Sequence, residues 1–341
     1  MPANLSPEYK AAEAAFRAAR EPRERLECLR EMLRTIPKHK GTEHLQGDIK
    51  ARIKLLTEEL AGPKKGGTRG GPALVIRPEG AAQISVLGPP NSGKSALVAR
   101  LTGAHAEVGP YPFTTRFPQP AMLPYKDIHF QLVDLPPITR DHPVPWIVNA
   151  LQPAGAALLV VDLSDPACLE RTAEVRTLLA EKRVSLLADW GATLEPPDPD
   201  AEDYDPFAIR LPTLLVAAKS DLLDDPDEEI AVFKDLGGLA LPSIAASVET
   251  GTGHDAIGPF LFERLAIARV YTKTPGRPPD MGTPFTVRTG GTVHDVARLI
   301  HKDFARSLKY ARLWGRSGQF SGQQVGRDHP VHDGDIIEIR L

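Results

Sequence analysis

One short stretch, residues 88–95, constrains the fold of this chain more than any other part of its sequence. It reads Gly-Pro-Pro-Asn-Ser-Gly-Lys-Ser and fits the G-x-x-x-x-G-K-S/T pattern of a phosphate-binding loop. The apolar run at 82–87 predicts a buried strand before the loop, and residues 95–101 predict a helix after it. Because the motif needs a strand, a loop and a helix in this order, the sequence predicts a P-loop nucleotide-binding domain.

The chemistry of this loop depends on its backbone and on two side chains. Backbone N–H groups of the loop and of the helix N-terminus are expected to point at the β-phosphate of a nucleotide. Lys94 is expected to reach the β- and γ-phosphates and to take part in catalysis, and the Ser95 hydroxyl is expected to bind Mg²⁺. The predicted phosphate-binding residues are Pro90, Asn91, Ser92, Gly93, Lys94, Ser95 and Ala96.

Three later segments, each at the end of an apolar run, indicate which nucleotide binds. Asp134 follows the run 128–133, at a position where a carboxylate can hold the hydration shell of Mg²⁺. Asp221 follows the run 213–218 and can accept two hydrogen bonds from guanine that adenine cannot donate. A short strand and loop at 244–248 can contact the base oxygen. The order predicts a guanine site, with adenine the disfavoured alternative. Its base-side residues are Lys219, Asp221, Ala246, Ser247 and Val248.

Charge and composition bound the class of protein. The net charge is +5 over residues 1–70, −12 over 71–269 and +4 over 270–341. An acidic partner such as RNA would therefore meet the two ends of the chain, although charges of this size also arise by ordinary scatter. The two cysteines lack metal-ligand spacing, and there is neither a signal-peptide pattern nor an apolar run of about 18 residues. We therefore expect a cytoplasmic protein without a membrane span.

The alternation of segments predicts the architecture. Apolar residues at helical spacing over 8–34 and 43–60 predict an N-terminal helical hairpin. Alternating strand and helix patterns then predict an α/β fold, the doubly wound and mostly parallel sheet of P-loop NTPases, with a surface loop at 195–211. A capping box at Thr292 and a strand at 307–314 predict a ubiquitin-like β-grasp tail. The predicted domains are the hairpin at 1–61, a flexible basic linker at 62–81, the nucleotide-binding domain at 82–269 and the β-grasp domain at 270–341.

Several segments carry a resemblance to a known family. The tail contains Arg-Val-Tyr-Thr-Lys at 269–273, His-Lys-Asp-Phe at 301–304 and Val-Gly-Arg-Asp-His at 325–329. It resembles, almost segment by segment, the TGS domain of the developmentally regulated GTP-binding (DRG) proteins, which are Obg-like GTPases. The N-terminal segment 38–45 and the Tyr-Pro-Phe-Thr-Thr sequence at 111–115 resemble the same family. The resemblance covers nearly the whole chain.

This resemblance implies a GTPase that binds GTP and GDP, uses Mg²⁺ and associates with ribosomes or structured RNA. It implies that Thr115, in the segment called switch I, is a Mg²⁺ ligand and acts in catalysis, with Thr114 as the second candidate for this ligand. Asn91 stands where potassium-activated GTPases carry a ligand for a monovalent cation, so K⁺ is a candidate cofactor. The alternative for Asn91 is an ordinary loop residue that caps its own backbone.

Two substitutions depart from the family pattern. Pro137 replaces the switch II glycine whose N–H contacts the γ-phosphate, and proline has no N–H. Ala218 replaces the asparagine that ties the base to the phosphate loop. The sequence therefore leaves two functions open. One is a slow GTPase switch on ribosomes, and the other is a protein that binds GTP or GDP and RNA with negligible hydrolysis.

The tail also contains candidate RNA contacts. Tyr310 and Trp314 either stack on RNA bases or pack in the core of the domain. The candidate phosphate contacts are Lys302, Arg306, Lys309 and Arg312.

Overall fold

The computed structural model describes residues 5–19, 22–37, 42–61, 76–103, 117–190 and 205–341. The chain divides into two compact units, Met1–Arg77 with Glu195–Ile209 and Pro78–Leu194 with Arg210–Leu341. The first unit has one hydrophobic core and the second has separate cores in its nucleotide-binding and β-grasp parts. The predicted switch I segment at 111–115 and most of the predicted linker lie outside the described residues.

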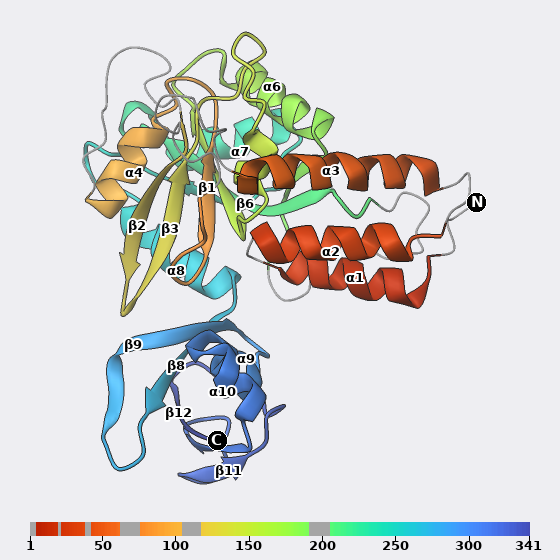
Figure 1. The fold of residues 1–341 in the computed structure, drawn as a ribbon. Helices are drawn as coiled ribbons and strands as arrows, with labels where there is room; N and C mark the ends of the chain where they lie inside the picture. The colour runs from red at the N-terminus through yellow and green to blue at the C-terminus, as the bar shows by residue number, and fades with distance from the viewer. Residues whose placement is uncertain (1–4, 20–21, 38–41, 62–75, 104–116, 191–204) are drawn as a thin grey trace. The chain divides into compact units, whose positions relative to one another are not determined.

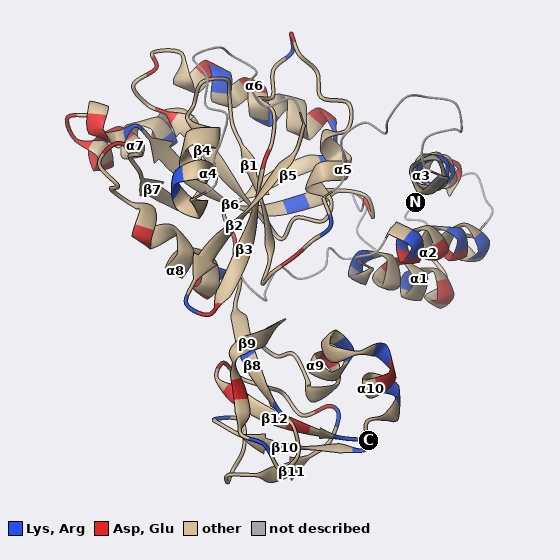
Figure 2. Cartoon of the chain, turned by 60° about the vertical axis from the view of Figure 1, so that its left-hand side comes forward, with Lys and Arg blue, Asp and Glu red and all other residues tan. Residues whose placement is uncertain are grey.

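The central sheet of the second unit has the strand order β2-β3-β1-β4-β6-β5, and β7 pairs with β6 (Figure 1 labels β1, β2, β3 and β6, and Figure 2 labels all seven strands). The strands that pair in parallel are β1 (Gln83–Leu87), β3 (Ile128–Asp134), β4 (Ala156–Asp162), β6 (Ile209–Ala218) and β7 (Ser243–Ala245). β2 (Gln119–Tyr125) runs antiparallel to β3, and β5 spans Val184–Leu187. Parallel pairing brings the carboxyl ends of the strands to one edge of the sheet, where α/β proteins bind ligands.

Helices cover this sheet, and β1 and β4 are buried along their whole length. α4 (Lys94–Thr102) and α8 (His254–Arg264) share one core with the alternate strand residues Ile84, Val86 and Leu158. The other described helices of this domain are α5 (Ile147–Leu151), α6 (Cys168–Glu181) and α7 (Pro226–Leu236) (Figure 2). The predicted P-loop fold with a mostly parallel sheet is confirmed. No helix within the described ranges is long and apolar enough to cross a membrane.

The described part of the N-terminal unit contains three helices, α1 (Pro7–Ala18), α2 (Pro22–Thr35) and α3 (Glu43–Ala61). The expectation of a two-helix hairpin is corrected here, because the segment expected to form its first arm contains two helices. Pro22 occupies the first turn of α2, and proline both lacks an N–H and disfavours helical backbone in the residue before it. Tyr9, Leu29 and Ile49, one from each helix, are fully buried in a single core.

The segment predicted as a surface loop at 195–211 ends in buried structure. Phe207 is 4% exposed and belongs to the core of the helical unit. Its ring meets Phe16 edge-on with 6.1 Å between centroids, and the Arg52 guanidinium lies 4.1 Å from its centroid. β6 then begins at Ile209, inside the predicted loop. Because the segment is acidic and rich in proline, its composition did not indicate that Phe207 is buried.

The C-terminal domain is a five-stranded sheet with the order β11-β10-β12-β8-β9. Its strands are β8 (Ile267–Lys273), β9 (Pro279–Arg288), β10 (Tyr310–Trp314), β11 (Gln323–Val325) and β12 (Asp335–Arg340). α9 (Val293–Ile300) begins with the predicted capping box, formed by Thr292 and Asp295. The strand predicted at 307–314 starts later than expected, because His301 caps a second short helix, α10 (Lys302–Ser307). The β-grasp fold is confirmed.

A charged cluster joins the turn between β2 and β3 to the first strand of the β-grasp sheet. The Arg269 guanidinium donates to Asp127 at 2.7 Å and to Asp333 at 2.9 Å. The Tyr271 hydroxyl also donates to Asp127. Hydrogen bonds from Arg269 hold the pKa of Asp333 below its usual range. Arg269 thus connects the nucleotide-binding sheet to a loop of the β-grasp domain.

Candidate nucleotide-binding site

The loop after β1 has a conformation that favours glycine at two positions of the motif. Gly88 has a φ of 150°, and a Cβ there would lie 2.2 Å from the Val160 carbonyl oxygen on β4. Gly93 has a φ of 89° and precedes the first residue of α4. The close approach of β4 and the start of α4 therefore explain why the first and sixth residues of the loop are glycines.

Lys94 lies beneath this loop. Its Nζ donates to the carbonyl oxygens of Gly88 at 3.2 Å and Pro89 at 2.7 Å. Burial lowers the pKa of its ammonium group to about 8, and the nearby Asp134 carboxylate offsets part of that effect. Neutral carbonyls compensate a buried charge less well than an anion does. A phosphate group bound in the loop would supply the negative charge that this buried ammonium requires.

Ser95 and Asp134 form the second part of the site. The Ser95 hydroxyl donates to Asp134 Oδ2 at 2.5 Å. Asp134 is the last residue of β3, in register with Val86 of β1, and is 2% exposed. A hydroxyl and a carboxylate side by side are oxygen donors of the kind that Mg²⁺ prefers, so these residues fit the predicted ion. The third predicted metal ligand, Thr115, lies outside the described residues.

The other predicted loop residues occupy different environments. Asn91 is exposed and has a φ of 58°, in the left-handed region that asparagine tolerates. Ser92 is buried, and its hydroxyl donates to the Pro89 carbonyl at 3.0 Å. Pro90 and Ala96 are partly exposed on either side of this turn. Ser92 therefore stabilises the loop itself, whereas Asn91 is accessible from solvent.

The structure brings the two predicted base-side segments together. β6 ends at Ala218, and Asp221 lies exposed in the 3₁₀ turn Ser220–Leu222 that follows. The Ser220 N–H donates to the Ala246 carbonyl at 3.1 Å, and the Ala246 N–H donates to Ala217 at 2.8 Å. Ser247 is fully buried and Val248 is half-buried in the loop after β7. The Lys-Ser-Asp turn and the loop at 246–248 thus form one hydrogen-bonded edge.

Asp162 belongs to this edge and was missed by the sequence analysis. Its Oδ2 lies 2.5 Å from Lys219 Nζ, and its Oδ1 accepts hydrogen bonds from the Ser164 N–H at 3.0 Å and hydroxyl at 2.6 Å. Lys219 itself has a φ of 56°, so a strained turn and an ion pair together place its side chain. The signal was present, because Asp162 ends an apolar strand in the same way as Asp134.

The two departures from the family pattern are also located. Ala218 is 4% exposed, and its Cβ lies 3.7 Å from the place where a Cβ on Gly93 would be. It therefore lies next to the phosphate loop, with a methyl group that cannot form a hydrogen bond. Pro137 is buried three residues after Asp134. Its missing N–H leaves this stretch with one donor fewer.

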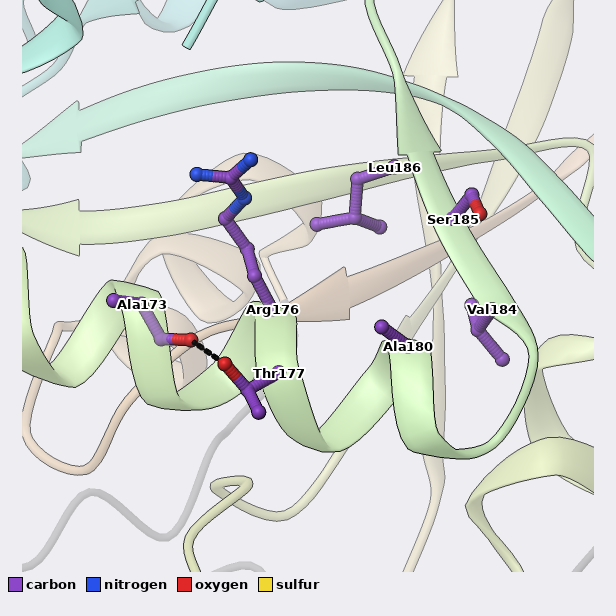
Figure 3. A pocket seen from close by; sticks show the side chains of 7 residues that line it. All are labelled: Ala173, Arg176, Thr177, Ala180, Val184, Ser185 and Leu186. Carbon is purple, nitrogen blue, oxygen red and sulfur yellow. Dashed lines mark hydrogen bonds between the residues drawn. The ribbon is translucent and has the colours of Figure 1, made fainter. Parts of the chain in front are cut away.

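A separate cavity in the second unit lies between α6 and β5 and shares none of the predicted site residues (Figure 3). The Arg176 guanidinium donates to the Gly237 carbonyl at 2.9 Å, at the C-terminal end of α7. The residues that line the cavity are Ala173, Arg176, Thr177, Ala180, Val184, Ser185 and Leu186.

The chain is similar to GTP-binding proteins along almost its whole length. Residues 83–189 match the family described as 50S ribosome-binding GTPase, and residues 268–341 match the TGS domain family. An uncharacterized GTP-binding protein of Methanocaldococcus jannaschii is 30% identical over 93% of this chain and 92% of its own length. Developmentally-regulated GTP-binding protein 1 of Xenopus laevis is 27% identical over 91% of this chain and 95% of its own.

A solved structure shares the fold. The YchF GTPase of Schizosaccharomyces pombe has a TM-score of 0.50 at 15% identity and covers 78% of this chain and 100% of its own.

Replacing Asp162 tests its role in placing Lys219. Asp162→Asn removes the charge of this ion pair, and the Lys219 side chain is 42% exposed, so solvent screens part of the loss. We expect GDP affinity, measured by fluorescence titration, to fall by less than about tenfold. Asp165→Asn is the matched control, since Asp165 pairs with Arg171 instead. Equal GDP affinity in the two variants would show that Asp162 does not support the base edge.

Proposed function

The chain belongs to the developmentally regulated GTP-binding (DRG) family of Obg-like GTPases with a C-terminal TGS domain, and from this premise we propose that it is a slow GTPase switch associated with ribosomes or structured RNA. Binding of guanine nucleotides follows from the family. The observation that supports hydrolysis is the group formed by Lys94, Ser95 and Asp134, in which a buried ammonium lies beside a hydroxyl–carboxylate pair.

Each of these side chains has a proposed part in the reaction. Lys94 would position the β- and γ-phosphates and stabilise negative charge on them. Ser95 and Asp134 would hold Mg²⁺, with Thr115 as a third ligand that also acts in catalysis. Mg²⁺ held by these residues would supply positive charge that stabilises the negative charge of the phosphate groups during hydrolysis. The loop residues from Asn91 to Ala96 would hold the phosphates through their backbone N–H groups, and Pro90, which has no N–H, would line the site.

The proposed base site lies at the edge formed by the Lys-Ser-Asp turn and the loop after β7. Asp221 would accept hydrogen bonds from the guanine N1 and N2 groups, and Lys219 would line the base. Ala246, Ser247 and Val248 would lie near the base oxygen. The hydrogen bond from Ser220 to Ala246 supports this assignment, because it holds the two segments at a common edge.

A second function remains supported by particular residues. Pro137 cannot donate to a γ-phosphate, and Ala218 cannot tie the phosphate loop to the base segment by a hydrogen bond. Both changes weaken the difference between the GTP-bound and GDP-bound states more than they weaken nucleotide binding. The alternative is therefore a protein that binds GTP or GDP and RNA and hydrolyses GTP at a negligible rate.

Guanine selectivity is expected to depend on Asp221. In Asp221→Asn the guanine N1–H and N2–H groups lose a charged acceptor, which should weaken GDP binding by about 2 kcal/mol, or roughly thirtyfold. Competition of labelled GDP against unlabelled GTP and ATP measures both affinity and selectivity. Asp224→Asn, nearby on the same loop, is the control. A wild-type protein that binds ATP as tightly as GTP would contradict the guanine site.

Single-turnover hydrolysis of GTP separates the two functions. We expect slow hydrolysis that requires Mg²⁺, and an increase of about tenfold or more in Pro137→Gly, because glycine restores an N–H donor near the γ-phosphate. The assay is run with and without ribosomes. Wild-type hydrolysis no faster than that of Lys94→Ala under both conditions would favour the alternative function. An unchanged rate in Pro137→Gly would show that this segment does not face the γ-phosphate.

We also propose that K⁺ binds beside Asn91, which is exposed on the phosphate loop. A cation here would add positive charge next to the phosphates. The same assay is then expected to run faster in K⁺ than in Na⁺, and Asn91→Ala should abolish the difference. Equal rates in the two salts would rule out the cation role.

Association with ribosomes or structured RNA is proposed for the basic terminal modules and places the protein in the cytoplasm. The net charge of +4 over residues 270–341 supports this, since cations that neutralise phosphates release counterions. We expect cosedimentation with ribosomes that weakens as salt rises and falls when residues 270–341 are deleted. Retained GDP binding would show that the truncated protein is folded. Unchanged cosedimentation would show that this domain does not contact the ribosome.

A further inference from the structure

The β-grasp sheet has one face covered by helices and one face without them. Ala311 and Leu313 of β10 share a core with Val296 and Ala297 of α9 and Ala305 of α10. Because side chains alternate along a strand, the intervening residues of β10 lie on the opposite face. We call this the outer face, and its β10 residues are Tyr310, Arg312 and Trp314.

The position of the two aromatic residues distinguishes stacking on RNA bases from packing in the core of the domain. Tyr310 and Trp314 are half-buried and lie outside the core cluster of the domain. They are therefore surface aromatic rings supported from one side by the sheet. The turn that follows β10 adds Phe320, which is 65% exposed. An apolar patch rimmed by polar side chains on a surface is typical of an interaction site.

Cross-strand pairing places cationic side chains beside these rings. Tyr310 lies opposite Arg340, and Arg312 lies opposite Glu338 on β12. From β8, Lys273 places its Nζ 4.4 Å from the centroid of the Trp314 ring. The outer face therefore brings aromatic and cationic side chains together across three adjacent strands, with Ile336 and Glu338 of β12 between them.

The charge of this face is unbalanced around β10 and β12, whereas Arg269 of β8, on the same face, is paired with Asp127 and Asp333. Glu338 is 3% exposed and lies 2.6 Å from Arg340 and 3.7 Å from Lys273, so one carboxylate serves two cations. Arg312 is exposed on the same face and adds a third cation. The excess is positive, so the face complements a partner that carries repeated negative charge and flat apolar groups.

We propose that the outer face of the β-grasp sheet binds single-stranded RNA, with bases stacked on Tyr310 and Trp314 and phosphates paired with Arg312. This inference rests on the proposed RNA association and identifies the surface that performs it. Unpaired bases offer the two chemistries that the face accepts, aromatic planes and a regular row of phosphates. A paired helix offers only the second on its exterior.

Four cationic residues were predicted from the sequence as RNA contacts, and the structure places them on different elements of the domain. Lys302 and Arg306 belong to α10, whose Ala305 packs on the covered side of the sheet. Arg312 projects from the outer face, and Lys309 precedes β10. Only Arg312 in this group therefore lies on the aromatic face, and the α10 cations supply a matched control on the other side of the domain.

The test uses the full-length protein and a fluorescently labelled oligouridylate, with anisotropy as the readout. Tyr310→Leu should weaken binding by about tenfold through loss of stacking, whereas Tyr310→Phe keeps the ring and should bind like the wild type. Arg312→Gln should weaken binding and lower the slope of log affinity against log salt by about 0.7, as expected for one lost contact to a single strand. Arg306→Gln on α10 should change neither quantity. GDP binding and thermal unfolding establish that each variant is folded.

Each contrary outcome points to a different failure. If the wild type binds neither oligouridylate nor ribosomes, the proposed RNA association is wrong. If the wild type binds but Arg306→Gln weakens binding more than Arg312→Gln, the RNA surface is the helical side and the outer-face assignment is overturned. If Tyr310→Leu and Tyr310→Phe bind alike, stacking on this face is excluded. If an oligoglutamate peptide binds the face as tightly as oligouridylate, the partner is an acidic protein segment instead.

Discussion

The parallel register of four neighbouring strands is the constraint on which the rest of the site depends. Val86 of β1 pairs with Asp134 of β3, and Asp162 of β4 pairs with Ala218 of β6. Because the strands run in the same direction, their carboxyl ends meet at one edge of the sheet, and the polar residues that end them are held within reach of one another. The 2.5 Å contact between Ser95 and Asp134 is a direct product of this register.

The phosphate loop combines steric and electrostatic requirements at the same place. Gly88 allows the loop to pass against the Val160 carbonyl, and this path puts Lys94 below the turn, where its Nζ donates to two backbone carbonyl oxygens. Burial disfavours the charged form of this ammonium group and thereby lowers its pKa. A loop with this geometry is suited to bind an anion. The substitutions at Pro137 and Ala218 reduce the number of further contacts that depend on that anion.

The nucleotide-binding sheet and the β-grasp sheet share a physical connection. The hairpin of β2 and β3 ends in Asp134 on one side and turns at Asp127 on the other. Arg269 and Tyr271 bind that turn through Asp127, and Arg269 also binds Asp333 in the β-grasp domain. A strand that carries a proposed metal ligand is thus attached by its far end to the domain proposed to bind RNA.

Local patterns in the sequence predicted the phosphate loop, the strand that ends in Asp134, the strand that precedes Asp221 and the capping box at Thr292, because each depends on residues close in the chain. The TGS domain was predicted from the family resemblance. Other features were decided only by tertiary structure. The burial of Phe207 depends on packing partners far away in sequence. The ion pair joins Asp162, at the end of β4, to Lys219, just after β6, and these two residues are 57 positions apart in the chain. The outer face of the β-grasp sheet likewise exists only once β10, β12 and β8 are paired, since pairing alone sets which side chains share a face.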